Sequence, residues 1–232
     1  MQRLHENSNR QPKIMEKKLN DIKRYLRDIK FSIIFGEGQI TLENDLEEFS
    51  GKVPFFFGKS HQKKRNKYIE QMKELDGVLT GSAALSMYRI NGVQIFKRYP
   101  NDLDFMISRD NFMKFCGMNN FTNVNYTNTV VSLDFQTGKN RGTDSYGSHR
   151  GYYFYTDFDV IGTDEDVKYE VVGDLKVAKL LDIVNYKLYL IEKYMTNTGK
   201  QYDRDAHREA EKHVNDLFRI VTTIAANENK KA

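Results

Sequence analysis

The chain contains a single cysteine, Cys116, among its 232 residues. One thiol cannot form an internal disulfide, which favours a protein of a reducing compartment. No apolar run approaches the roughly 20 residues that a membrane-spanning helix needs. Residues 1–7 also lack the apolar core of a signal peptide. These absences predict a protein without a membrane segment that resides in the cytoplasm of the cell that makes it.

Motifs of several common protein classes are missing as well. The chain has no Gly-Lys-Ser/Thr phosphate loop, no cysteine and histidine spacing of a zinc site, and no Gly-x-Ser-x-Gly turn. Each of those motifs places its ligands or its nucleophile in a fixed geometry. Their absence argues against P-loop hydrolysis, zinc-finger binding and α/β-hydrolase chemistry.

The composition is that of a globular protein with a polar surface. Hydrophobic residues make up 39% of the chain and charged residues 29%. Its length of 232 residues is enough for one good-sized domain or two small ones. The net charge of +4 is compatible with a nucleic-acid partner but does not require one. The basic run Lys63-Lys64-Arg65 is either a solvated helix start or loop, or a basic rim that attracts nucleotide or RNA.

Hydrophobic periodicity predicts helices, then a compact α/β core, then a helical pair. Gly77 and the Asn91-Gly92 turn separate neighbouring elements in the core. The expected helices cover residues 13–35, 60–76, 83–90, 110–115, 174–195 and 203–226, and the expected strands cover residues 78–80, 102–107, 124–135, 151–161 and 167–172.

The first chemical signal is the break at Gly81-Ser82, between the apolar strand Val78–Thr80 and the helix that follows it. A glycine there lets the backbone approach a ligand closely, and the N–H groups of a helix start favour phosphate. The alternative is an ordinary strand-to-helix turn, in which Ser82 caps the helix.

The second signal is the pair Asp102 and Asp104, which flank Leu103 at the opening of an apolar strand. With a side-chain period of two, both carboxylates lie on one face while Leu103 points into the core. Two adjacent carboxylates repel each other unless a cation neutralises them, and Mg²⁺ prefers oxygen ligands. The alternative is a polar strand edge preceded by the turn sequence Pro100-Asn101. A phosphate cradle beside a metal-holding pair indicates phosphoryl or nucleotidyl transfer.

These motifs, in residues 79–85 and 98–105, resemble the signature of the nucleotidyltransferase superfamily that includes DNA polymerase beta. That signature is Gly-Gly/Ser, a helix, and then Asp-x-Asp on the next strand. The chain is most similar to the AbiEii-type transferases, which occur as toxins in phage-defence and toxin–antitoxin systems. The resemblance implies an α+β fold, a small mixed β-sheet with flanking N-terminal helices and a C-terminal helical module. The implied parts are an N-terminal arm and helical segment (1–58), the catalytic core (59–173) and the C-terminal module (174–232).

The resemblance also implies an activity. Such an enzyme moves a nucleoside monophosphate from an NTP to a hydroxyl with the help of Mg²⁺ or Mn²⁺, held here by Asp102 and Asp104. Gly81 and Ser82 would hold the triphosphate. Arg98, four residues before Asp102, either contacts phosphate, bridges to the two carboxylates or is a surface charge. The acceptor stays open between tRNA or another RNA, a protein hydroxyl and a small molecule. An antitoxin or another protein partner is compatible with the same resemblance.

Superfamily members normally add a third carboxylate from a neighbouring strand, which acts as the general base. Asp159 is the preferred residue, because Asp159-Val160-Ile161 looks most like the family's third strand. Asp157, which shares the face of Asp159, and Asp134 are the alternatives.

The C-terminal module contributes two further candidates by resemblance. Lys187 would touch phosphate or base, and Asp216 would position it. His213 stands where the family pattern has an acidic residue, so it is either a phosphate contact or a helix-face histidine. Tyr186 and Tyr189 fit core or helix-packing roles better than a base-stacking platform.

Two other functions compete with the enzyme. One is a catalytically inactive transferase fold that serves as a binding or structural module, for example one encoded by a phage. The other is an RNA-binding adaptor that uses Lys63-Lys64-Arg65.

Overall fold

The computed structural model describes residues 14–28, 40–44, 59–97, 100, 102–121, 130–133, 140–143, 158–196 and 204–228. The chain forms two compact units. The helical unit comprises Met1–Thr41, Tyr88–Phe96 and Leu180–Ala232, and the sheet unit comprises Leu42–Met87 and Lys97–Lys179.

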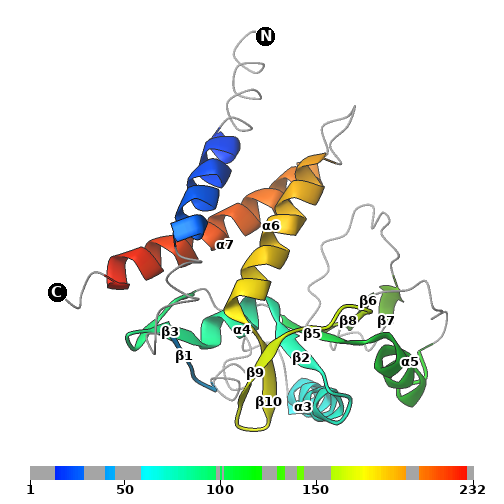
Figure 1. Cartoon of the computed structure of the whole chain (residues 1–232). Helices are drawn as coiled ribbons and strands as arrows, with labels where there is room; N and C mark the ends of the chain where they lie inside the picture. The colour runs from blue at the N-terminus through cyan, green and yellow to red at the C-terminus, as the bar shows by residue number, and fades with distance from the viewer. Residues whose placement is uncertain are drawn as a thin grey trace. The chain divides into compact units, whose positions relative to one another are not determined.

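The sheet unit is built around a sheet of seven strands in the order β7-β6-β8-β5-β2-β10-β9 (Figure 1). The β5–β8 and β2–β10 pairs are parallel, and the other neighbouring pairs are antiparallel. The predicted α+β class with a mixed sheet is therefore confirmed. Its strands are β2 (Val78–Thr80), β5 (Leu103–Ser108), β6 (Val130–Leu133), β7 (Asn140–Thr143), β8 (Phe158–Thr163), β9 (Tyr169–Val172) and β10 (Leu175–Ala178), and its helices are α3 (Lys59–Glu74), α4 (Gly81–Met87) and α5 (Arg109–Met118).

One face of this sheet is closed by an aromatic cluster. Phe105 on β5 stacks on Phe158 of β8 with ring centroids 5.2 Å apart. Tyr68 of α3 contacts Phe158 at 5.8 Å and Phe115 of α5 at 5.7 Å. Both helices therefore cover the face on which every second residue of β5 and β8 is buried.

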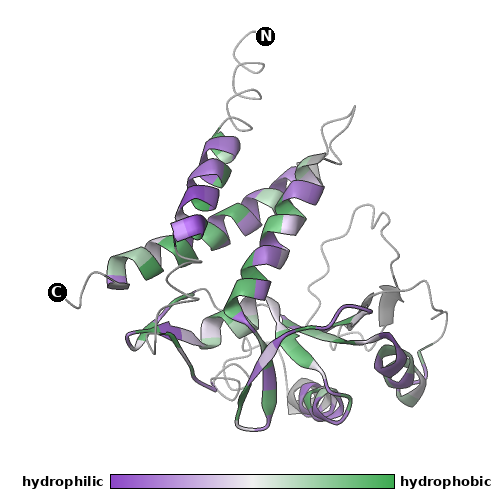
Figure 2. Cartoon of the chain, viewed as in Figure 1, coloured by the Kyte–Doolittle hydropathy of each residue, from purple (hydrophilic) through white to green (hydrophobic). Residues whose placement is uncertain are grey.

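The helical unit contains a helix over residues 14–28, α6 (Leu180–Thr196) and α7 (Arg204–Glu228), together with the strands β3 (Tyr88–Ile90) and β4 (Val93–Gln94). Lys18 donates a hydrogen bond to Asn215 of α7, and Lys23 pairs with Glu192 of α6. Figure 2 shows polar and apolar residues alternating along α6 and α7, as expected of helices that bury one face. The buried stripe of α7 includes Ala210, Val214, Leu217, Val221 and Ile224.

The predicted helix over residues 83–90 is wrong at its C-terminal end. Helix α4 ends at Met87, and β3 follows it directly. Strands β3 and β4 form a hairpin whose two loop residues, Asn91 and Gly92, have φ values of 50° and 75°. A two-residue Asn-Gly loop with both φ positive is the preferred hairpin connection, so the turn determines the strand before it.

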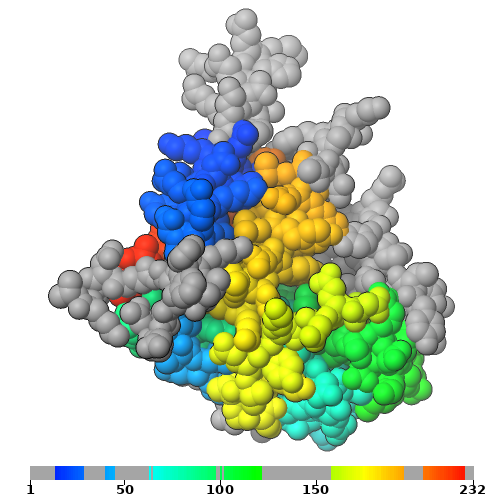
Figure 3. Space-filling model, viewed as in Figure 1, coloured from blue at the N-terminus to red at the C-terminus, as the bar shows by residue number. Residues whose placement is uncertain are grey.

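The predicted helix over residues 174–195 is wrong at its N-terminal end. Residues Leu175–Ala178 form β10, which pairs with β9 and β2, and α6 begins only at Leu180. Gly173, with φ of +63°, and Asp174 form the two-residue loop of the β9–β10 hairpin, which Figure 3 shows in yellow. Gly-Asp between two short apolar runs is itself a hairpin signal.

The remaining predicted helices and strands overlap elements of the structure. Helices α3 and α7 cover most of the predicted ranges, and Ser108 caps α5 by accepting a hydrogen bond from the Asn111 N–H at 3.3 Å. The predicted strand 124–135 contains β6, 151–161 overlaps the first part of β8, and 167–172 contains β9. The part boundaries at residues 58 and 173 stay predictions. Among the helices that the structure describes, none is long and apolar enough to cross a membrane.

Candidate metal centre

Three aspartates from two neighbouring strands lie together in the sheet unit. Asp102 immediately precedes β5, Asp104 lies on β5, and Asp159 lies on β8 directly opposite Asp104 in the parallel register. One carboxylate oxygen from each residue lies within 4.8 Å of one from each of the others, and all three residues are partly exposed. The structure thus brings together the predicted pair and the preferred third carboxylate.

The alternation of the two strands explains why these side chains meet. Leu103, Phe105 and Phe158 point to the face covered by α3 and α5, and each is almost completely buried. Their neighbours Asp104 and Asp159 therefore point to the other face. The same apolar residues that build the core thus place the two carboxylates side by side.

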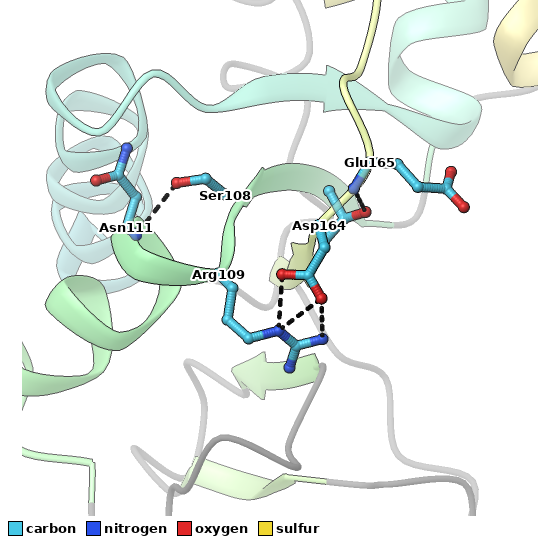
Figure 4. Close-up of polar contacts among 6 residues, drawn as sticks. Ser108, Arg109, Asn111, Asp164 and Glu165 are labelled. Atoms are coloured by element: carbon cyan, nitrogen blue, oxygen red, sulfur yellow. Dashed lines mark hydrogen bonds and ion pairs between the residues drawn. The ribbon is translucent and has the colours of Figure 1, made fainter.

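The far ends of β5 and β8 are joined by a separate set of polar contacts (Figure 4). Ser108 and Thr163, the last residues of the two strands, pair in the register, and the residues that follow them, Arg109 and Asp164, form an ion pair. The Arg109 Nε lies 3.2 Å from Asp164 Oδ1 and 3.3 Å from Oδ2. Asp164 is well exposed, so the pair contributes less than about 1 kcal/mol. The ion pair is compatible with the register that brings Asp104 and Asp159 together.

The electrostatics of the cluster favour a cation. Unit charges 4.8 Å apart repel each other by about 3 kcal/mol per pair at an effective dielectric constant of 20. A divalent ion held by oxygen ligands removes that cost, and three carboxylates are a donor set that suits Mg²⁺ or Mn²⁺. The described residues thus fit a hard divalent cation.

Gly81 lies directly against this cluster. It follows Thr80, which pairs with Asp104 across β2 and β5, and its φ of +66° lies in the left-handed region. A Cβ atom at this position would lie 2.9 Å from Cγ and 3.2 Å from Cβ of Asp104, and it would overlap the carboxylate oxygen Oδ2. Only glycine satisfies both the backbone angle and the space beside Asp104.

Ser82 is the second residue of α4 and is buried. It follows Gly81 in the chain, so its backbone begins beside the Asp104 carboxylate. Together the two residues form the strand-to-helix turn that the sequence predicts as a phosphate site.

The C-terminal candidates, Lys187 and Asp216, are brought together in the helical unit. The Lys187 Nζ donates to Asp216 Oδ2 at 3.2 Å, and the side chains are only 5% and 4% exposed. His213, one turn before Asp216, is buried, and its ring stacks on Tyr194 at 6.2 Å. This ion pair joins α6 to α7 inside the unit.

Two of the tyrosines assigned to packing are on the surface instead. Tyr186 is 36% exposed and Tyr189 is 53% exposed, so a core role for them is wrong, whereas a role in helix packing stays a prediction. Their spacing of three residues does not predict which face of α6 they occupy, because apolar residues precede and follow them in the sequence of the helix.

Several other candidates can be placed only in part. Arg98, Asp134 and Asp157 lie outside the described residues. Within the basic run, Lys63 is exposed and Arg65 is buried. A continuous basic surface made by this run is therefore not supported.

Comparison with known proteins gives little further information. No protein-family model matches the chain, and no curated protein matches it. Among solved structures, the Megavirus polyadenylate synthase is similar over 81% of this chain, with 11% sequence identity and a TM-score of 0.40. The chain spans about a third of the length of that protein, 34%.

Proposed function

We propose that the chain is a Mg²⁺-dependent nucleotidyltransferase that moves a nucleoside monophosphate from an NTP to an acceptor hydroxyl. The observation that supports this is the convergence of three carboxylates beside the Gly81 turn. Residues from three segments, around Gly81, Asp104 and Asp159, meet through one antiparallel and one parallel strand pair. This is the arrangement that the resemblance to the superfamily implies.

Asp102 and Asp104 hold the metal in this proposal, with Mg²⁺ or Mn²⁺ as the ion. Bound there, the ion supplies charge neutralisation for the triphosphate and acidifies the acceptor hydroxyl. Asp159 accepts the hydroxyl proton as the general base. The hydroxyl oxygen then bonds to the α-phosphorus, the bond from that phosphorus to the β-phosphate oxygen breaks, and pyrophosphate leaves.

The remaining site residues are assigned to the nucleotide. Gly81 and Ser82 hold the β- and γ-phosphates, and Arg98 adds a phosphate contact. The resemblance assigns Lys187 to a contact with phosphate or base and Asp216 to positioning Lys187, and the two side chains form an ion pair within the helical unit. As a buried pair, Lys187 and Asp216 also pack α6 on α7, and that role alone accounts for their geometry.

The biological setting follows only from the resemblance. An RNA such as tRNA, or a protein hydroxyl, is the proposed acceptor, and a toxin of a phage-defence or toxin–antitoxin system is the proposed role. Such a protein would act in the cytoplasm and have an antitoxin as a partner.

The activity is tested by incubating the full chain with each α-³²P-labelled NTP, Mg²⁺ and total cell extract. We expect one labelled RNA or protein band, which disappears with EDTA and with Asp104→Asn. Asp166→Asn, which removes an exposed carboxylate outside the cluster, should leave the labelling unchanged. Labelling that survives Asp104→Asn would refute the assignment of the site.

Metal binding is measured separately by thermal unfolding without nucleotide. Mn²⁺ should raise the unfolding midpoint of the wild type and of Asp166→Asn but not that of Asp104→Asn. Metal-dependent stabilisation without any labelled product would favour the alternative, an inactive transferase fold that has kept its ion site.

A further inference from the structure

One side of α6 carries two exposed tyrosines and a partly buried lysine in one row, which we call the tyrosine stripe: Tyr186, Tyr189 and Lys193. The spacing of three and four residues places them on one face of the helix. Figure 3 shows part of α6, in gold, on the visible face of the molecule. The opposite side of the helix buries Ile183, Val184, Lys187 and Ile191.

The three side chains are arranged as a group. The rings of Tyr186 and Tyr189 are nearly parallel, with an interplanar angle of 26° and centroids 6.3 Å apart. The Lys193 Nζ lies 5.8 Å from the centroid of the Tyr189 ring. A single exposed tyrosine is ordinary on a protein surface, but two adjacent rings with a cation over one of them are less so.

We propose that the tyrosine stripe binds single-stranded nucleic acid by stacking bases on Tyr186 and Tyr189. Every nucleobase has a π face, so neighbouring exposed rings accept successive bases without reading their sequence. Lys193 supplies a cation for a phosphate of the same strand. This binding surface needs neither the metal nor the NTP, so it does not rest on the proposed transfer reaction.

The surroundings of the stripe favour nucleic acid over a protein helix as the occupant. Among the described residues of α6, the two tyrosines are the only large exposed hydrophobic side chains. A helix that docks in a groove uses several well-exposed aliphatic anchors at this spacing, whereas the described aliphatic side chains of α6 are all partly or fully buried. The stripe therefore offers stacking surfaces rather than an apolar groove.

The charges around the stripe limit how strongly phosphate contributes. Glu192 lies next to Lys193, but its carboxylate is paired with Lys23 at 2.7 Å. Asp182 lies one turn before Tyr186 and adds a negative charge at the other end of the stripe. Stacking therefore provides most of the affinity, and the salt dependence should be shallow. One phosphate contact corresponds to a slope of about −0.7 in log K against log salt for a single strand.

The test is fluorescence anisotropy of labelled 12-nucleotide oligo(U), oligo(A) and the matching DNA oligomers, titrated with the full chain in EDTA. Stacking on each base is worth about 1–3 kcal/mol, so the Tyr186→Ala/Tyr189→Ala variant should bind at least about tenfold more weakly. The variant with both tyrosines changed to phenylalanine keeps the rings and should bind like the wild type. Lys193→Gln should weaken binding less and flatten the salt slope.

Tyr169→Ala is the matched control, because Tyr169 is 41% exposed and also has a lysine cation, Lys176, 4.5 Å from its ring centroid. It lies on β9 in the sheet unit and should not affect binding. Both a preference for RNA over DNA and equal binding of the two would support binding at the stripe. No binding by the wild type, no loss in the double alanine variant, or an equal loss in Tyr169→Ala would each overturn the proposal.

Discussion

Replacing Gly81 with alanine tests both the fold and the candidate metal centre. The φ of +66° at this position is unfavourable for alanine by about 1–2 kcal/mol. The added methyl group must also displace the Asp104 carboxylate, whose Cγ lies 2.9 Å from the position of the new Cβ. Overpacking of this kind typically costs a further 1–3 kcal/mol.

We therefore expect Gly81→Ala to lower the free energy of unfolding by about 2–4 kcal/mol. That is a large part of the 5–15 kcal/mol typical of a folded domain, but it leaves the native state populated. Because Asp104 must move, the Mn²⁺-induced rise in the unfolding midpoint should be lost or strongly reduced. Urea unfolding gives the first quantity, and thermal unfolding with and without Mn²⁺ gives the second.

Two other glycines serve as controls that separate the cost of backbone strain from the cost of displacing Asp104. Gly92 has a φ of +75° but no atom within 4 Å of an added Cβ, so Gly92→Ala carries the backbone strain alone. It should cost about 1 kcal/mol, since alanine also restricts the unfolded chain. Gly117 has an open side as well, without positive φ, and Gly117→Ala in α5 should be neutral or slightly stabilising. Both controls should keep the full Mn²⁺ response.

A double variant isolates the contact with Asp104. In an Asp104→Ala background the Cγ atom is gone, so the extra cost of Gly81→Ala should fall toward that of Gly92→Ala. The close approach of Gly81 to the carboxylate would be refuted if Gly81→Ala cost no more than Gly92→Ala and kept its response to Mn²⁺.

Two further predictions concern buried groups. Lys187→Met should lower the free energy of unfolding, measured in urea, by about 3–5 kcal/mol, because the Asp216 carboxylate is then buried without its cation. Adding Asp216→Leu should recover most of the lost stability, and equal stability of the single and double variants would contradict the ion pair. Burial raises the pKa of the Cys116 thiol to about 11, and the residue is only 2% exposed. Iodoacetamide at pH 8 should therefore alkylate Cys116 only after denaturation, as measured by mass spectrometry. Rapid alkylation of the native protein would contradict the burial of this thiol and show that α5 opens.

The sequence was sufficient to identify the cluster because its members sit in strongly patterned segments. Asp104 and Asp159 each alternate with buried apolar residues, so their shared face follows from the period of a strand. That β5 and β8 are neighbours was an expectation from the resemblance, since nothing local determines which strands pair. The close approach of Gly81 to Asp104 could not be predicted, because it depends on the register between β2 and β5.

Errors in the fold came from giving helical periodicity more weight than turn chemistry. Both Asn91-Gly92 and Gly173-Asp174 are two-residue hairpin loops, and each implies strands on its two sides. The apolar spacing around them also fits a helix, so periodicity alone extended α4 and α6 across β3 and β10. The prediction of a core role for Tyr186 failed for a different reason. Which side of an amphipathic helix is covered depends on its tertiary neighbours, and the sequence of the helix does not identify them.

The in-register pairing of β5 with β8 has a consequence for how the candidate metal centre is assembled. A slip of one residue would bring Phe158 to the carboxylate face and put Asp159 among the aromatic rings, at the expense of the stack between Phe105 and Phe158. Hydrophobic packing alone therefore selects the alignment in which the ligands meet. Core packing therefore brings the three carboxylates together by itself, so a cation that binds there would not have to align the two strands.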